Sequence, residues 1–203
     1  MMKKTILLAL AMMMTCGAMQ AQDGYYDKKH EVGITYGFGS TSQIVDVFED
    51  AIISMVDVRL SDESWVGPIT AEYYYHPKNW LGVGGILGYG QMSQDVYLNG
   101  KHNGKDGDLK NSYLTLMPAV KFDYVRTKHF GMYSKLAFGA TLRTEKVDYN
   151  DDKDLKDFNE SEFHINWQVS LLGLEAGGQA LRGFMELGMG EQGIYVLGVK
   201  YRF

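Results

Sequence analysis

The residue types that could do chemistry are sparse in this sequence, and the most suggestive group is an acidic stretch that begins at Asp148. Asp148, Asn150 and Asp152 have the one–three–five spacing of a calcium-binding loop, in which side-chain oxygens at alternate positions turn towards one ion. The sixth position of such a loop is a glycine and the twelfth a glutamate, but this chain has Lys153 and Asn159 there. We therefore predict a solvated loop, with a specific calcium site as the alternative.

The five histidines predict no metal site, because no pair of them has the spacing that metal ligands usually show. Four fall at expected strand ends, turns or loops, where solvation is the simplest interpretation: His30, His76, His102 and His129. His164 lies inside a regular alternating run, on its polar, inward side. We expect His164 to be a hydrogen-bonding side chain, and a general base for a nucleophile is the alternative. No cofactor is expected.

The N-terminal residues 1–21 have the pattern of a cleaved secretory signal. Lys3 and Lys4 precede an apolar run that is too short to span a bilayer as a helix, and Ala21 supplies a small residue at the expected cut. Cleavage there removes Cys16, the only cysteine, so the mature chain has no disulfide or thiolate chemistry. Lipidation of Cys16 is the alternative fate of this segment.

Composition narrows the class of the remaining domain, residues 22–203. Loss of two lysines with the signal leaves 18 of the 20 basic residues against 25 acidic ones, which moves the formal charge from −5 to −7. A net-acidic secreted chain argues against nucleic acid as a partner. The chain is 45% hydrophobic, yet no stretch is long and apolar enough for a membrane-crossing helix. A soluble secreted domain and a membrane protein built from strands remain.

Regular alternation is the dominant pattern of this domain. Apolar side chains occupy every second position in eight runs, as in strands that present one apolar and one polar face. These runs are residues 32–39, 69–76, 81–90, 114–124, 135–145, 163–171, 181–190 and 195–203. Their parity slips near Leu171 and Leu172, which predicts a bulge, and Pro118 predicts a second one because proline cannot donate to the ladder.

The polar rows of these runs indicate whether the apolar face of the barrel points outwards to lipid or inwards to a cavity. They carry charges of both signs at positions where a ligand carrier with an apolar cavity would need large apolar residues: Glu72, Lys121, Asp123, Lys135, Arg143, Glu145, Arg182, Glu186, Lys200 and Arg202. The opposite rows are almost free of charge and rich in Tyr, Trp and Phe, which suits contact with lipid. We therefore predict a barrel whose charges form a network in a filled lumen, since eight strands leave room only for side chains.

The connections between the runs alternate in length. Short turns follow the second, fourth and sixth runs, and longer polar stretches follow the first, third and fifth, as the two ends of a membrane barrel require. Residues 43–56, in the first long connection, have apolar side chains at helical spacing, and Ser42 is a suitable N-cap. We expect a short helix that packs on the barrel rim. Docking of this helix on a partner or on lipid is the alternative.

The C-terminal strand and the eight runs together carry a resemblance to a known family. Gly198, Tyr201 and the terminal Phe203 resemble the C-terminal signal that the barrel-assembly machinery reads in Gram-negative outer-membrane proteins, although Val196 stands where that signal prefers a polar residue. The chain as a whole resembles the small outer-membrane barrel family that includes OmpX and the barrel of OmpA. Two stretches look like strands of the broad outer membrane protein beta-barrel domain group: residues 116–122 and 183–188.

The resemblance implies an all-β fold, an eight-stranded antiparallel up-and-down transmembrane barrel with a short helix in its first long loop. It implies an integral protein of the cell outer membrane, in contact with outer-membrane lipid and with a possible protein partner at its external loops. The role it implies is structural or interactive, and not enzymatic. Two alternatives remain: a small ion channel, and a lipid A deacylase or acyltransferase. The deacylase pattern has a serine where this chain has Asn166.

Overall fold

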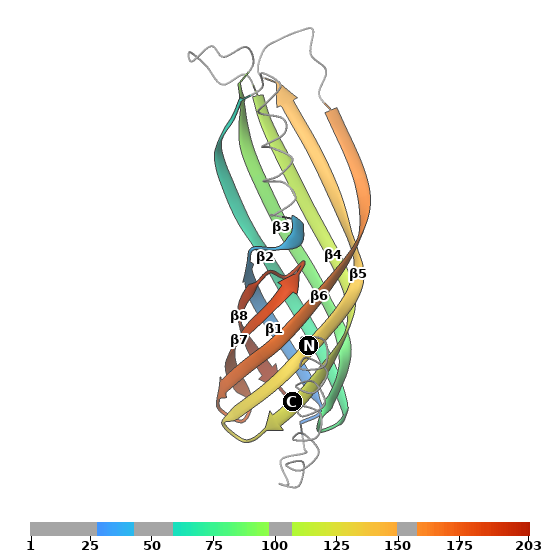
Figure 1. Cartoon of the computed structure of the whole chain (residues 1–203), viewed down its shortest axis with the longest axis vertical. Helices are drawn as coiled ribbons and strands as arrows, with labels where there is room; N and C mark the ends of the chain where they lie inside the picture. The colour runs from blue at the N-terminus through green and yellow to red at the C-terminus, as the bar shows by residue number, and fades with distance from the viewer. Residues whose placement is uncertain (1–27, 43–58, 98–106, 150–157) are drawn as a thin grey trace, which may run out of the picture.

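The chain folds into one closed β-barrel (Figure 1). The computed structural model describes residues 28–42, 59–97, 107–149 and 158–203. Its strands are β1 (His30–Phe38), β2 (Arg59–Lys78), β3 (Leu81–Tyr97), β4 (Gly107–Arg126), β5 (Phe130–Tyr149), β6 (Phe158–Gly177), β7 (Leu181–Gly190) and β8 (Tyr195–Arg202). Each strand pairs antiparallel with its neighbours in sequence order, and β8 returns to β1. The predicted eight-stranded antiparallel barrel is confirmed.

The first and last strands meet at the β1–β8 seam. The register of this seam pairs Val32 with Tyr201. Beyond the last pair, the His30 N–H donates to the Phe203 carbonyl and the Phe203 N–H donates to the His30 carbonyl, each at 2.9 Å. Backbone hydrogen bonds therefore close the sheet on itself up to the C-terminal residue, so that the seam presents no free edge to other chains.

The barrel is apolar outside and polar inside. Exposed and buried side chains alternate along β1, β7 and β8, as the period of a strand requires. On the outer surface, Leu116 is 62% and Ile165 is 70% exposed, whereas the inward-facing Lys135 and Arg182 are 0% exposed. A soluble domain has the opposite arrangement. The outer surface is therefore one that lipid, and not water, would cover.

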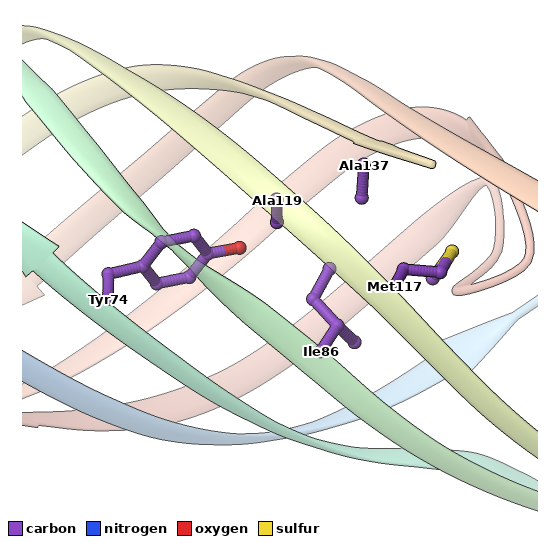
Figure 2. Packing of buried hydrophobic residues seen from close by; sticks show 5 residues of the cluster. All are labelled: Tyr74, Ile86, Met117, Ala119 and Ala137. Carbon is purple, nitrogen blue, oxygen red and sulfur yellow. The ribbon is translucent and has the colours of Figure 1, made fainter. Parts of the chain in front are cut away.

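One apolar layer lies inside the barrel (Figure 2). It is made by side chains from β2 to β5: Tyr74, Ile86, Met117, Ala119 and Ala137. Ala119 and Ala137 are partners across β4 and β5, and their small side chains leave space for the Tyr74 ring and for Ile86. Most of the remaining lumen is filled by charged and hydrogen-bonding groups.

Strands β2 to β6 extend well beyond β1, β7 and β8 (Figure 1). The latter three have 9, 10 and 8 residues, whereas β2 to β6 have 17 to 20. The expected runs that correspond to these five strands are therefore all too short: 69–76, 81–90, 114–124, 135–145 and 163–171. The outward row of β4 shows why, because it changes from Leu114 to Ser112 and Lys110 while the pairing continues. The apolar alternation therefore ends before the strand does, while the hydrogen-bond ladder continues.

Of the two predicted bulges, only the first forms. The pairing of β6 with β7 shifts register between Ser170 and Leu172, which confirms the slip in parity there. At Pro118 the prediction is wrong, because β4 and β5 keep one register on both sides of the proline. Gly139 on β5 permits this, since a Cβ there would overlap the Leu116 carbonyl oxygen. Without a side chain, β5 stays close to β4 although the proline has no N–H to donate.

The three short turns lie at one end of the barrel, which we call the turn end; the opposite end is the open end (Figure 1). The turns are tight: the Thr127 N–H donates to the Phe130 carbonyl at 3.0 Å, and the Gly178 N–H to the Leu181 carbonyl at 2.8 Å. Within the described residues, no helix is long and apolar enough to cross a bilayer. The helix expected over residues 43–56 lies outside the described residues, as do the positions 150–157 of the calcium-loop alternative.

The outer apolar belt predicts a position-dependent cost for a charge. Leu136→Arg places a cation near the middle of the outward row of β5, and we expect the unfolding free energy in lipid vesicles to fall by about 2–4 kcal/mol. Thr144→Arg lies on the same outward row beyond the apolar residues, and it should cost no more than about 1 kcal/mol. Urea unfolding in vesicles measures both. Equal costs for the two variants would contradict lipid contact at this surface.

Candidate functional site: the charge network of the lumen

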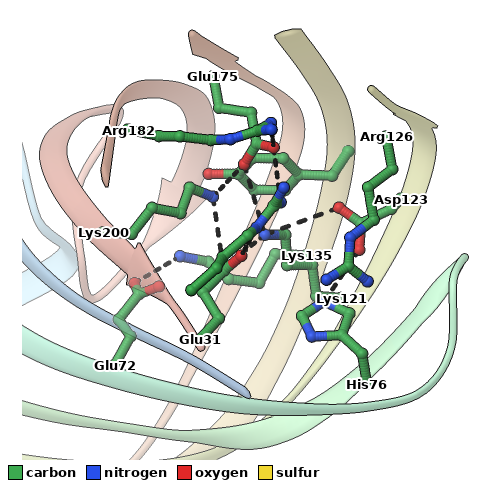
Figure 3. A network of polar contacts seen from close by, with 12 residues as sticks. Glu31, Glu72, His76, Lys121, Asp123, Arg126, Lys135, Glu175, Arg182 and Lys200 are labelled. Carbon is green, nitrogen blue, oxygen red and sulfur yellow. Dashed lines mark hydrogen bonds and ion pairs between the residues drawn. The ribbon is translucent and has the colours of Figure 1, made fainter. Parts of the chain in front are cut away.

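Glu31 on β1 gathers cations from two other strands in the lumen (Figure 3). Its Oε1 lies 2.6 Å from the Nζ of Lys121 on β4 and 3.4 Å from the Nζ of Lys200 on β8. Its Oε2 accepts a hydrogen bond of 2.8 Å from the Nε of Arg202. All four side chains are buried. A charge-assisted contact of this kind ties β1 to β4 and across the seam to β8.

Glu175 on β6 is the second shared carboxylate. Its Oε1 accepts hydrogen bonds from Arg182 at 2.7 Å and from Arg202 at 2.6 Å. Its Oε2 lies 2.5 Å from the Nζ of Lys200 and 3.8 Å from that of Lys121. Glu175 therefore shares three of its four cations with the carboxylate on β1, and the two carboxylates form one network.

Lys135 on β5 is the centre of a second cluster. Its Nζ lies 2.8 Å from Glu72 and 2.7 Å from Glu186. Glu186 also accepts hydrogen bonds from the Tyr133 hydroxyl at 2.7 Å and from the Ser170 hydroxyl at 2.6 Å. Both carboxylates in this cluster thus share one cation, and hydrogen bonds from the two hydroxyl groups add to the stabilisation of Glu186, because buried carboxylates need such partners where water is excluded.

An aromatic ring joins the two clusters. The Tyr133 hydroxyl binds Glu186, and the ring of Tyr133 lies 4.0 Å from the Nζ of Lys121 and 4.3 Å from that of Lys200. Ring faces attract cations most strongly where water is excluded. Beside Lys121, Asp123 completes the first cluster, with its Oδ2 3.0 Å from the Nε2 of His76. The expectation that His76 is solvated is wrong, because its ring is buried against this carboxylate.

The β7–β8 connection closes the lumen towards the open end. Gln192 is buried and donates to Thr70 at 2.8 Å and to Glu72 at 2.6 Å. The Gln192 N–H in turn donates to the Oε1 of Gln168 at 2.9 Å. Gly37 on β1 leaves space for this connection, because a Cβ there would overlap the Gln192 carbonyl oxygen. The sequence predicts only a short external connection here, whereas the structure folds it inwards as a cap.

Glu191 in the same connection is a buried carboxylate bound by hydroxyl groups. The Ser42 hydroxyl lies 2.8 Å and 2.9 Å from its two carboxylate oxygens, and the Thr115 hydroxyl donates to it at 3.4 Å. Burial raises the pKa of the Glu191 carboxyl above its usual value, and the hydrogen bonds from Ser42 oppose that shift. Glu191 therefore anchors the start of the long β1–β2 connection to the cap.

The structure brings together eight of the ten predicted lumen charges: Glu72, Lys121, Asp123, Lys135, Arg182, Glu186, Lys200 and Arg202. Arg143 and Glu145 lie elsewhere. They are partly exposed, 3.4 Å from each other, on the part of β5 that continues beyond the short strands. Their ion pair thus lies apart from the two clusters, at a height that the shorter strands β1, β7 and β8 do not reach.

Two central residues are absent from the predicted set, Glu31 and Glu175. The ten predicted charges comprise six basic and four acidic residues, and this imbalance was a signal that acids were missing. Glu31 lies two residues before Gly33 on the same face of β1, so the alternating pattern could have predicted that it points inwards. Glu175 lies beyond the bulge of β6, where the parity of the run has changed.

The three residues of the predicted assembly signal lie on β8 or directly after it. Gly198 pairs with Phe184 of β7, and Tyr201 and Phe203 face outwards. The Phe203 ring stacks on His30 with centroids 5.4 Å apart. His164, expected inside the lumen, is instead half-exposed, and its Nε2 lies 3.3 Å from Glu162.

The geometry of the barrel and its lumen indicates the class of protein to which the fold belongs. Among the described residues, no group of three or more His, Cys, Asp or Glu side chains could hold a metal ion. A closed barrel with an apolar exterior and a lumen filled by buried ion pairs has the architecture of a small outer-membrane barrel.

Comparison with known proteins adds a likeness of overall fold. No protein-family model matches the chain, and no curated protein sequence matches it. The chain is similar to Ail, the attachment invasion locus protein of Yersinia pestis, solved with the heparin analogue sucrose octasulfate: 13% identity, a TM-score of 0.48, and coverage of 87% of this chain and 97% of that one. A structure of Ail without the analogue has 14% identity, a TM-score of 0.43 and the same coverage. The assignment of the fold rests on the strand pairing itself.

Removing one shared carboxylate should be costly. Glu175→Gln leaves Arg182, Arg202 and Lys200 with one negative charge fewer, and we expect the unfolding free energy to fall by about 3–5 kcal/mol, as for other broken buried pairs. Glu162→Gln, which removes the half-exposed partner of His164, should cost about 1 kcal/mol or less. Urea unfolding in vesicles compares them. A loss for Glu175→Gln no larger than for Glu162→Gln would show that the network does not stabilise the barrel.

The cap depends on the missing side chain at Gly37. Gly37→Ala forces the Gln192 backbone away from β1, and we expect a loss of about 2 kcal/mol or more in unfolding free energy, together with a more accessible lumen. Gly183→Ala is the matched control, since nothing lies within 4 Å of a Cβ there. It should change stability by less than about 1 kcal/mol. Hydrogen exchange of the Gln192 amide reports the cap directly, and unchanged protection in Gly37→Ala would contradict the proposed contact.

Proposed function

We propose that this chain is an outer-membrane barrel protein with a structural or interactive role at the cell envelope, and that it is not an enzyme. The observation that carries the proposal is the contrast between the lumen and the open end of the barrel. The lumen is filled and capped, while five strands continue beyond the apolar belt. A protein built to pass solutes needs the opposite arrangement, so the working surface is on the outside.

The proposed route to the membrane uses both ends of the chain. Residues 1–21 act as the secretory signal, and residues 22–203 form the exported barrel. The terminal strand, with Gly198, Tyr201 and Phe203, is the segment that the barrel-assembly machinery reads. The short turns then face the periplasm and the open end faces outwards, as in other barrels of this kind. Lipid covers the outer belt.

The extension of β2 to β6 at the open end is the proposed contact surface. Its outward side carries polar residues such as Lys110 and Lys146, which are partners across β4 and β5. Over β5 and β6, its inner side exposes charges of both signs: Arg143, Glu145, Glu162 and His164. A mixed, hydrated and accessible surface of this kind suits a protein partner better than a small substrate, which needs an enclosed pocket.

The two alternatives have less support. A channel would need a path through charges that are paired at 2.5–2.8 Å. A lipid-modifying enzyme would need a hydroxyl nucleophile that His164 activates, whereas the Nε2 of His164 lies 3.3 Å from the Glu162 carboxylate.

A photo-crosslinking amino acid tests the contact surface in whole cells. At position 161, on the open-end extension, it should capture at least one protein partner. At position 136, in the apolar belt, it should capture lipid and no such partner. Mass spectrometry identifies the products.

The control is the same probe in the turn end, at position 128, which faces the other compartment. Crosslinks to the same partner from positions 161 and 128 would contradict a surface role. The enzyme alternative would be favoured if deletion of the protein changed the mass of lipid A and the His164→Ala variant produced the same change.

A further inference from the structure

The turn end carries basic side chains beside exposed aromatic rings. Four basic residues are exposed there: Lys29, Lys78, Lys128 and His129. Lys28 is half-buried, with its Nζ 5.9 Å from the centroid of the Tyr201 ring. We call these five residues the basic rim. They come from the start of β1, the β2–β3 turn and the β4–β5 turn, so they are spread around the barrel.

The rings beside the basic rim form an interfacial belt. The Nζ of Lys78 lies 5.6 Å from the centroid of the Trp80 ring, and Trp80 is 42% exposed. Outward-facing aromatic residues continue around the same end: Tyr75, Phe130, Tyr201 and Phe203. Aromatic side chains of this kind lie at the level of lipid headgroups, and long lysines beside them reach into the headgroup layer.

The lumen network holds the rim in place. Arg126 donates to the Lys28 carbonyl at 2.9 Å, and Arg182 donates to the Lys128 carbonyl at 2.8 Å. Arg182 also binds the buried Glu175. The backbone that carries two of the rim lysines is therefore fixed before any ligand binds, which lowers the entropic cost of binding.

The exposed charged side chains of the described turn end are all basic. Its acidic side chains are Glu31, Asp123 and Glu175, and all three are buried in ion pairs with lumen cations. The remaining negative group there is the C-terminal carboxylate. The described part of the open end is mixed, because Glu160 and Glu162 are exposed together with its lysines. The two ends of the barrel therefore differ in the charge they offer to the adjacent leaflet.

We propose that the basic rim binds the headgroups of anionic phospholipids in the leaflet at the turn end. On the orientation given under the proposed function, this is the periplasmic leaflet. Each cation near an anionic lipid surface favours binding by about fivefold. Two lysines lie against rings at the protein–lipid boundary, and this placement favours a lipid neighbour over the cell-wall glycan that lies further from the bilayer.

Native mass spectrometry of the folded mature protein tests this. The protein is mixed in detergent with equal amounts of phosphatidylglycerol and phosphatidylcholine, and the lipids retained are counted. We expect phosphatidylglycerol to be retained at least about fivefold over phosphatidylcholine. The double variant K78Q and K128Q should lose most of that preference. The double variant K110Q and K146Q makes the same change of charge at the open end and should keep it.

Each other outcome overturns the proposal. Equal retention of the two lipids by the unaltered protein would exclude a site for anionic lipid. An equal loss of preference in both double variants would show that the preference depends only on the net charge of the protein. Sedimentation with purified peptidoglycan addresses the other neighbour. If the K78Q and K128Q double variant no longer sedimented with peptidoglycan but kept its lipid preference, the basic rim would bind the cell-wall glycan and not lipid. A gel shift on heating confirms that each variant is folded. The crosslinks at position 161 do not depend on the rim, so failure here leaves the proposed function separately testable.

Discussion

Glu31 and Glu175 share Lys121, Lys200 and Arg202 inside a barrel too narrow for bulk water, and the rest of the structure depends on this sharing. Five cations and five carboxylates meet in the two clusters: Lys121, Lys135, Arg182, Lys200 and Arg202 with Glu31, Glu72, Asp123, Glu175 and Glu186. The formal charges of these ten residues balance. Neutrality is what allows an ionic interior, because an unpaired charge there would cost several kcal/mol.

The network also determines how the barrel closes. Glu31 lies on the first strand and Arg202 on the last, so their hydrogen bond crosses the seam from the inside. On the outside of the same seam, His30 stacks on Phe203. Ion pairs inside the barrel, backbone hydrogen bonds between the strands and stacked rings outside all join the first strand to the last. A C-terminal strand with alternating cations and aromatics therefore stabilises both faces of the seam at once.

Much of this architecture could be predicted from the sequence, and the exceptions have physical causes. Alternation reveals a strand only while its two faces meet different environments, so it found Lys200 and Arg202 but ended before the extension of β2 to β6. Which side chains pair across the lumen cannot be derived from any periodic pattern in the sequence. Glu175 is inward because a bulge reverses the parity of β6, and Gln192 enters the lumen because its turn folds inwards. Both depend on backbone geometry that residue types do not encode locally.

The basic rim follows from the same charge balance. The turn end could present a cationic surface only if its acids were occupied elsewhere, and the lumen occupies them. Arg182 makes the connection explicit, since one guanidinium binds Glu175 in the network and the carbonyls of Thr127 and Lys128 in the turn. A substitution that weakens the network would therefore also loosen the β4–β5 turn. The ion pairs that fill the interior are therefore also what shapes the surface of the turn end.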